Sequence, residues 1–168
     1  MFKKIHNLIK FYALKGALPL LYHDALNHTE IQFLINLVAG IEKKSRPILI
    51  VGANSIQVIQ IISAITSGSI QIVDSCEWNN LGFARKHHVS FLRALLQENP
   101  NKERLKLILN DTEGFIELYD DAPPLLAIVA KRVGQSDFEL LLHQLKEIGT
   151  QSVCFINWLN TLEYSTPK

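Results

Sequence analysis

The sequence predicts a doubly wound α/β domain built on a mostly parallel, five-stranded sheet, and three observations lead to this class. From Arg46 onward, short apolar runs alternate with longer segments of helical periodicity. The apolar runs lack polar–apolar alternation, as expected of strands that helices cover on both faces. The connections are short, and no repeat, linker or low-complexity tract interrupts the chain, which favours right-handed crossovers within one domain.

The expected α/β core spans residues 46–160, and its elements follow from these runs. The last helix has the clearest limits, because Ser136 and Glu139 form a capping box and Gly149 supplies a stop. A sheet of this class is expected to have the strand order 3-2-1-4-5. The expected strands are 48–52, 70–74, 105–110, 125–130 and 152–157. The expected helices are 55–66, 78–97, 112–119 and 136–148.

Two N-terminal helices are expected ahead of this core, within residues 1–45. The first has an apolar stripe that includes Phe2 and Tyr12, with lysines on the rest of its surface. It either packs on the body of the domain or docks on a partner or a membrane surface. The second begins near Thr29 and Gln32, which have capping-box spacing. The whole chain, 1–168, is therefore expected to form a single domain.

Composition narrows the class of function. The 168 residues are 48% hydrophobic and 20% charged, which suits a compact domain with a sizeable core. A net charge of +1 provides no general field for nucleic acid, so no nucleic-acid partner is expected. Cys76 and Cys154 lie outside any metal-ligand spacing and indicate a reduced, cytoplasmic protein. No apolar run has the length of a transmembrane segment.

The turn after the first expected strand indicates a ligand site. The run PILIVGANSIQ ends a strand at Gly52 and starts a helix, and the run IQIVD ends the next strand at Asp74. This arrangement outlines a nucleoside-binding βαβ unit, in which the ligand lies beyond the carboxyl ends of the strands. The candidate residues at this edge are Gly52, Ala53, Asn54, Asp74, Ser75, Asn110, Asp111, Lys131, Arg132 and Trp158.

The residues of this edge suit a nucleoside ligand, although each has a structural alternative. Gly52 lets the backbone approach a ligand and Asn54 suits the cap of the next helix, but both also suit an ordinary strand-to-helix turn. Asp74 can accept hydrogen bonds from ribose hydroxyls or cap the segment that follows it. Asp111 suits the cap of the next helix better than an adenine contact.

Other polar and aromatic residues have weaker assignments. Lys131 and Arg132 either hold a carboxylate or phosphate of a substrate or lie in a solvated loop. Trp158 either stacks on a ligand ring or packs at the rim of the crevice. His87 and His88 follow two other basic residues in a helical pattern, so an exposed basic face is expected in preference to metal binding or general-base work. No metal site and no nucleophile–base set is predicted.

Together these residues resemble the class I S-adenosylmethionine-dependent methyltransferases, in particular the small catechol-O-methyltransferase-like branch. The resemblance covers about residues 29–158 and rests on the turn VGANS, on Asp74, on Asn110-Asp111 and on the segment LLHQLKEIGTQSVCFINW. It implies a Rossmann-like fold, S-adenosylmethionine as the cofactor and a small molecule as the ligand. It also implies that the turn approaches the cofactor, that Asp74 binds the ribose hydroxyls and that Asn110-Asp111 lies near the adenine.

The chain also departs from the pattern of this family. Gly52 is the only glycine left of the usual cluster, and Ile50 stands where an acid is expected. Ala130 and Lys131 stand where metal-dependent members have a carboxylate, which indicates metal-independent chemistry if the protein is active. The chain ends soon after the fifth expected strand, which leaves no room for the family's terminal antiparallel hairpin. A second copy of the chain or a partner protein would then complete that edge.

Three functions stay open at this point. The first is an S-adenosylmethionine-dependent methyltransferase acting on an unknown small molecule, in which catalysis is mainly proximity and orientation. The second is a catalytically inactive methyltransferase-like domain that binds or scaffolds a partner at its sheet edge or its N-terminal helix. The third, a different nucleotide-binding domain such as an NAD-linked one, is disfavoured because G-x-G-x-x-G is absent.

Overall fold

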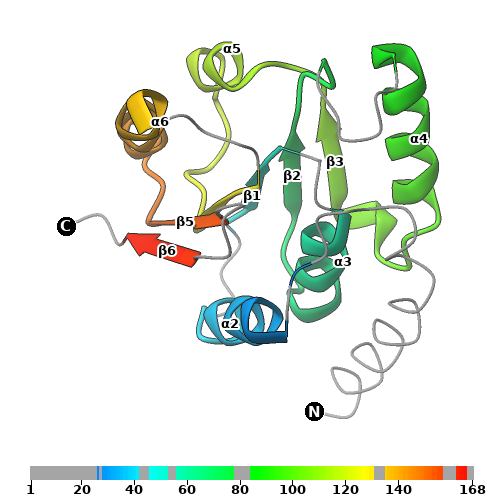
Figure 1. Ribbon diagram of the computed structural model, residues 1–168, viewed down its shortest axis with the longest axis horizontal. Helices are drawn as coiled ribbons and strands as arrows, with labels where there is room; N and C mark the ends of the chain where they lie inside the picture. The colour runs from blue at the N-terminus through cyan, green and yellow to red at the C-terminus, as the bar shows by residue number, and fades with distance from the viewer. Residues whose placement is uncertain are drawn as a thin grey trace.

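The protein is built around a single six-stranded sheet in a computed structural model that describes residues 26, 28–41, 46–52, 56–77, 84–130, 135–156 and 162–165. The order of the strands is β3-β2-β1-β4-β5-β6, and the first five strands in chain order are parallel (Figure 1). The predicted five-stranded parallel sheet and its order 3-2-1-4-5 are therefore confirmed. The strands are β1 (Ile48–Val51), β2 (Ile70–Val73), β3 (Leu105–Ile108), β4 (Leu126–Val129), β5 (Ser152–Ile156) and β6 (Leu162–Ser165).

The edge of the sheet beside β5 differs from the prediction. β6 pairs antiparallel with β5, and the register places Cys154 opposite Tyr164 and Ile156 opposite Leu162. The expectation that the chain leaves no room for the family's terminal antiparallel hairpin is therefore wrong in part, because one antiparallel strand, β6, lies at this edge. The physical reason is that four residues are enough for a strand when a neighbouring strand supplies all of the hydrogen bonds on one side.

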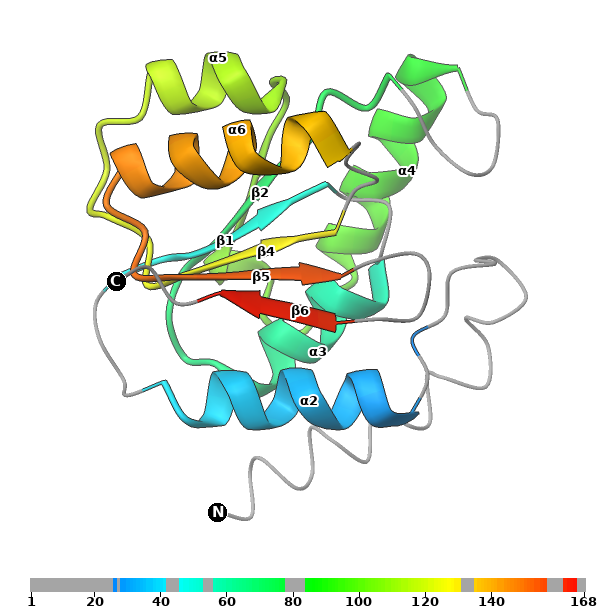
Figure 2. The same ribbon diagram turned by 60° about the vertical axis from the view of Figure 1, so that its left-hand side comes forward.

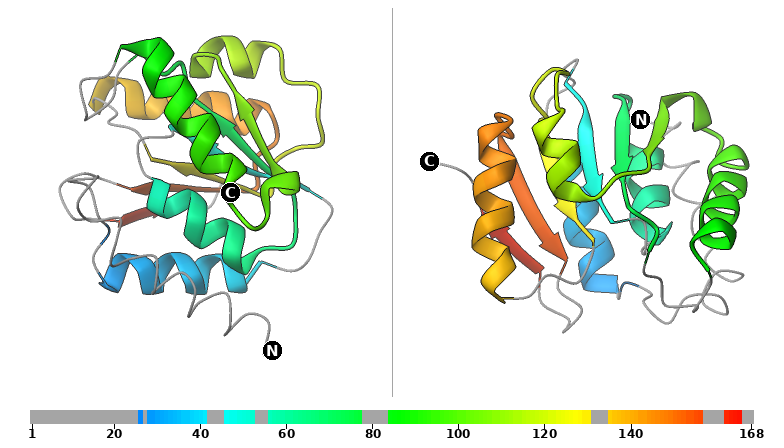
Figure 3. Two further views of the ribbon diagram at one scale, coloured as in Figure 1. Left: turned by 90° about the vertical axis from the view of Figure 1, so that its right-hand side faces the viewer. Right: turned by 90° about the horizontal axis from the view of Figure 1, so that it is seen from above.

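Helices cover both faces of this sheet. In Figure 2, α5 and α6 lie above the strands, whereas α2 and α3 lie below them. α4 lies at the β3 end of the sheet, away from β5 and β6 (Figure 3). No helix within the described residues combines the length and the apolarity needed to cross a membrane. The bounds are α2 (His28–Ala39), α3 (Ile56–Ile65), α4 (Arg85–Gln97), α5 (Thr112–Glu117) and α6 (Gln135–Glu147).

The predicted helices agree with these bounds in the parts that the structure describes. The expected N-terminal amphipathic helix lies outside the described residues, as do residues 78–83 at the expected start of α4. The helix expected near Thr29 is α2, and it packs against α3.

The core consists of two apolar clusters, one on each face of the sheet. Along β1, Ile48 and Ile50 join the cluster with α2, α3 and α4, whereas Leu49 and Val51 join the cluster with α5 and α6. All four side chains are at most 2% exposed, which explains why the run has no polar alternation. β3 is an exception to the predicted double burial, because it is an edge strand and its Lys106 is exposed.

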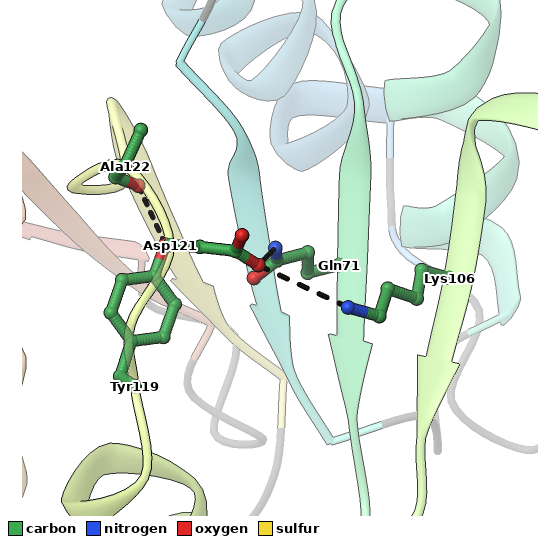
Figure 4. A network of polar contacts seen from close by, with 5 residues as sticks. All are labelled: Gln71, Lys106, Tyr119, Asp121 and Ala122. Atoms are coloured by element: carbon green, nitrogen blue, oxygen red, sulfur yellow. Dashed lines mark hydrogen bonds and ion pairs between the residues drawn. The ribbon is translucent and has the colours of Figure 1, made fainter.

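A polar network holds the loop between α5 and β4 over the edge of the sheet (Figure 4). The buried Gln71 of β2 donates a hydrogen bond from Nε2 to Oδ2 of Asp121 at 2.7 Å. The same oxygen lies 3.9 Å from Nζ of Lys106 on β3. The hydroxyl of Tyr119 donates to the carbonyl oxygen of Ala122 at 2.7 Å. The contacts of Asp121 thus hold the loop between α5 and β4 against β2 and β3.

Arg104 caps the carboxyl end of α3, and we expect its loss to be destabilising. Its guanidinium donates to the carbonyl oxygens of Thr66 at 2.6 Å, Ser63 at 2.9 Å and Gly68 at 3.3 Å. Arg104→Gln removes this charged donor set from partly buried acceptors, so the free energy of unfolding should fall by about 1 to 3 kcal/mol in urea titrations. Lys102→Gln, an exposed change in the same turn, should stay within about 0.5 kcal/mol of the unaltered protein. Equal stability of the two variants would contradict this role.

Candidate functional site

Gly52 forms the end of β1 at the predicted crevice. It is buried and has a φ of 94°, a conformation that favours glycine. Its N–H donates to the carbonyl oxygen of Val73 at 2.8 Å, and the N–H of Ala130 donates to the carbonyl oxygen of Val51 at 2.8 Å. The carboxyl ends of β2, β1 and β4 are thereby held side by side. Ala53 and Asn54, the other predicted residues of this turn, lie outside the described residues.

Asp74 follows β2 directly and is half-buried at the same edge. Its N–H donates to the carbonyl oxygen of Ile108 at 3.1 Å, and its Oδ1 accepts a hydrogen bond from the N–H of Cys76 at 2.6 Å. The structural alternative, in which Asp74 caps the segment that follows it, is therefore observed. A carboxylate has two oxygens and about four acceptor positions, so this bond is compatible with a further hydroxyl partner.

Cys76 occupies the turn after Asp74 in a neutral form. It is fully buried, and its φ of 59° makes it the non-glycine residue with positive φ among the described residues. Burial and the negative charge of Asp74 raise the pKa of its thiol to about 11, against smaller lowering effects of Arg85 and Arg93. A thiol with so high a pKa is a poor nucleophile at neutral pH.

The second cysteine gives a prediction on alkaline stability. Cys154 lies in β5 at 0% exposure, and burial raises the pKa of its thiol from 9.0 to about 12. Between these values the unfolded chain loses the thiol proton and the folded chain keeps it, so stability is lost as pH rises above 9. In that range, the Cys154 thiol should lower the free energy of unfolding by about 1.4 kcal/mol for each unit that the pH rises. In urea titrations between pH 8 and about 10.5, the free energy of unfolding should fall less steeply with pH for Cys154→Ala than for the unaltered protein. The same slope in both proteins would contradict this role of Cys154.

Asn110 and Asp111 follow β3 and lie against the first turn of α5. Oδ1 of Asp111 accepts a hydrogen bond from the N–H of Gly114 at 2.7 Å, so Asp111 is the N-cap of α5 as the sequence predicts. A Cβ built at Gly114 would lie 3.2 Å from Oδ1 of Asn110, which places the Asn110 amide over the same turn. Asp111 is exposed, whereas Asn110 is half-buried nearer the sheet.

The structure thus brings part of the predicted set together. Backbone hydrogen bonds join Gly52 to the end of β2, and join Asp74 to the end of β3, which Asn110 follows. Ser75 continues the edge, and its Oγ accepts from the N–H of Glu77 at 3.4 Å. Within the described ranges, no group of three or more His, Cys, Asp or Glu residues could hold a metal ion. The remaining predicted residues, Lys131, Arg132 and Trp158, lie outside these ranges.

His88 of α4 is buried, although the sequence predicts that it lies on an exposed basic face. Lys86 and His87 are exposed as predicted, but His88 is only 2% exposed. In the part of the chain that the structure describes, its Nδ1 has no hydrogen-bond partner. Nε of Arg85 donates to the carbonyl oxygen of Ser75 at 2.8 Å, which ties α4 to the turn after β2. The spacing of His88 four residues before the buried Leu92 is the signal that identifies the buried face of α4.

The combination of a parallel sheet, a glycine at the end of β1 and an acid after β2 defines a Rossmann-like architecture. Comparison with solved structures shows which proteins share this architecture. The O-methyltransferase from Bacillus cereus in complex with SAH aligns with a TM-score of 0.61 at 14% identity, covering 89% of this chain and 65% of that one. A putative O-methyltransferase from Klebsiella pneumoniae gives 0.61 at 14% identity, covering 92% and 74%. The O-methyltransferase TomG from Streptomyces achromogenes, in complex with SAM, gives 0.60 at 14% identity, covering 89% and 63%.

The chain therefore has the fold of the class I S-adenosylmethionine-dependent O-methyltransferases, as the resemblance of its motifs predicts. The likeness is one of structure, because neither a protein-family model nor a curated protein matches the sequence. The chain spans between 63% and 66% of the length of three such structures.

Proposed function

We propose that this protein is an S-adenosylmethionine-dependent methyltransferase-like protein that acts on a small molecule. One observation carries the proposal: Gly52, at a φ of 94°, and the half-buried Asp74 end the neighbouring strands β1 and β2. The strand order reverses between β1 and β4, and ligands of such sheets bind at this switch point.

The described residues of the edge fit an adenosyl group. Gly52 lacks a Cβ, so a ligand can approach the backbone closely at the point where α3 is about to begin. Asp74 presents a carboxylate that can accept hydrogen bonds from two ribose hydroxyls. Asn110 offers an amide donor and acceptor after β3, where a base edge would lie.

The chemistry of the proposed activity needs little from the protein beyond placement. S-adenosylmethionine, when bound, supplies an electrophilic methyl group. Gly52 and Asp74 would bind and orient the adenosyl part, and the gain in rate would come mainly from proximity and alignment with the acceptor. Ala130, at the end of β4, is buried and apolar, so this position offers no carboxylate to a metal ion and the proposed reaction is metal-independent.

A second function, an inactive methyltransferase-like domain that binds or scaffolds a partner, is favoured by one observation. Ile50 stands where the family has an acid, and it is 0% exposed within the core. An apolar side chain at this position contributes to packing and offers no hydrogen bond to a cofactor. This alternative predicts a well-folded protein that binds no S-adenosylmethionine.

Calorimetric titration with S-adenosylmethionine and S-adenosylhomocysteine, with NAD as a comparison, separates the two functions. If the first is right, both ligands bind saturably, and Asp74→Ala weakens binding by about 1 to 3 kcal/mol because ribose hydroxyls lose their acceptor. Asp74→Asn keeps an acceptor for the N–H of Cys76 and so separates loss of the ligand contact from loss of the turn. Asp120→Ala, an exposed acid outside the edge, should not change affinity. No binding to the folded protein would favour the scaffold function.

A further inference from the structure

The turn of residues 74–76 holds the carboxylate of Asp74 in one direction. Oδ1 of Asp74 accepts a hydrogen bond from the N–H of Cys76 at 2.6 Å, so the side chain closes a turn with the backbone two residues further along. The N–H of Asp74 donates to the carbonyl oxygen of Ile108 at 3.1 Å, which ties the start of the turn to β3. Both the backbone and the side chain of Asp74 are therefore fixed at the strand ends.

The turn depends on an uncommon backbone conformation at Cys76. Its φ of 59° lies in the left-handed region, which a residue with a Cβ rarely adopts. The side chain of Cys76 is 0% exposed and belongs to the same apolar cluster as Ile72 and Leu92. Packing of this side chain thus maintains a conformation that the backbone alone would not favour, and this conformation aims the N–H at Asp74.

Arg85 holds the same turn from α4. Its Nε donates a charge-assisted hydrogen bond to the carbonyl oxygen of Ser75 at 2.8 Å. After burial, the charges that act most on the pKa of the Cys76 thiol are those of Asp74, which raises it, and Arg85, which lowers it. Each residue of the turn is therefore fixed by a different part of the protein: Asp74 by β3, Ser75 by α4 and Cys76 by the core.

We propose that Cys76 and Arg85 are positioning residues for adenosyl binding, and that they act by fixing the direction of the Asp74 carboxylate. The inference rests on the proposed function, in which this carboxylate accepts the ribose hydroxyls. Two hydroxyls are accepted together only in a narrow range of carboxylate orientations, and a side chain that must first be ordered loses conformational entropy on binding. A carboxylate that is already oriented avoids this loss, so the turn raises affinity without itself contacting the ligand.

Calorimetric titration with S-adenosylhomocysteine, in a double-mutant cycle with Asp74→Ala, tests this role. Arg85→Gln removes the charged donor to Ser75, and Cys76→Val places a β-branched residue at positive φ, so each should weaken binding roughly 3- to 10-fold. Neither should weaken it further when Asp74→Ala is already present, because both act through that carboxylate. Two controls should stay within about twofold. Arg93→Gln removes an exposed cation of α4 whose charge also reaches Cys76, and Cys76→Ala keeps an unbranched Cβ.

Hydrogen exchange at the Cys76 amide measures the turn directly in the protein without ligand. Arg85→Gln should speed this exchange roughly 3- to 10-fold, and Arg93→Gln should leave it unchanged. Because Arg85 is exposed, Arg85→Gln is expected to fold, and it decides the outcome by itself if Cys76→Val does not fold.

The two proposals fail in different ways. If S-adenosylhomocysteine does not bind the unaltered, folded protein, the proposed function fails and the positioning role fails with it. If the unaltered protein binds this ligand and Arg85→Gln leaves the affinity unchanged, only the positioning role is overturned. The same holds if Arg85→Gln weakens binding equally with and without Asp74→Ala, because the residue would then act independently of the carboxylate.

Discussion

Ile50→Asp is expected to lower the free energy of unfolding by about 3 to 5 kcal/mol, although it introduces the acid expected at this position from the resemblance to the methyltransferases. Ile50 is 0% exposed, and the register of β1 places it between Ile72 of β2 and Ile128 of β4, both also fully buried. A carboxylate there would lose its hydration without gaining a described partner. Because domains of this kind are stable by only about 5 to 15 kcal/mol, the loss is a large fraction of the total.

Urea unfolding as a function of pH tests the cause of this loss. A buried carboxyl has a raised pKa, so the deficit of Ile50→Asp relative to the unaltered protein should shrink as pH falls toward 4 and the group is protonated. Ile50→Val, which removes one methylene, should cost about 0.5 to 1.5 kcal/mol with no such pH dependence. If Ile50→Asp were as stable as Ile50→Val and bound S-adenosylmethionine more tightly, the position would be open to the crevice and our placement of it in the core would be wrong.

Gly52→Ala is expected to destabilise the domain by about 1 to 3 kcal/mol and to abolish adenosyl binding. The φ of 94° at Gly52 is outside the region that L-residues adopt readily, and the N–H of this residue is held by Val73 of β2. Relief of the strain would require breaking this hydrogen bond, which holds β1 beside β2. Urea unfolding and calorimetric titration of the same preparation measure the two effects.

Gly40→Ala is the matched control for this substitution. Gly40 lies just after α2, and an added Cβ would meet only ordinary contacts, at 3.4 Å from the carbonyl oxygen of Asn36 and 3.6 Å from that of Leu37. The change should be neutral or stabilise by up to about 1 kcal/mol through the unfolded state. Equal effects of Gly40→Ala and Gly52→Ala would show that backbone conformation at Gly52 is not what the crevice requires.

The sheet was predictable because it depends on local patterns. The apolar run 48–51 is buried on both faces, which only a central strand of a covered parallel sheet requires. Asp111 caps α5 through a contact three residues away, so the cap is visible in the sequence. The order of the strands was expected from the doubly wound class of the sheet. Of the candidate site, Gly52, Asp74 and Asn110 are placed at neighbouring strand ends, and the cofactor contacts themselves stay predictions.

The sequence by itself determined the alternation of strands and helices and the capping of α5 by Asp111, because each depends on periodicity or on residues close together in the chain. Only the tertiary structure decided features that depend on distant segments. The pairing of β6 with β5 depends on a strand edge that local sequence does not describe. The burial of His88, and the approach of Arg85 to Ser75, depend on how α4 packs beside the sheet. A run of basic residues has no such direction until the packing of its helix selects one face for the interior.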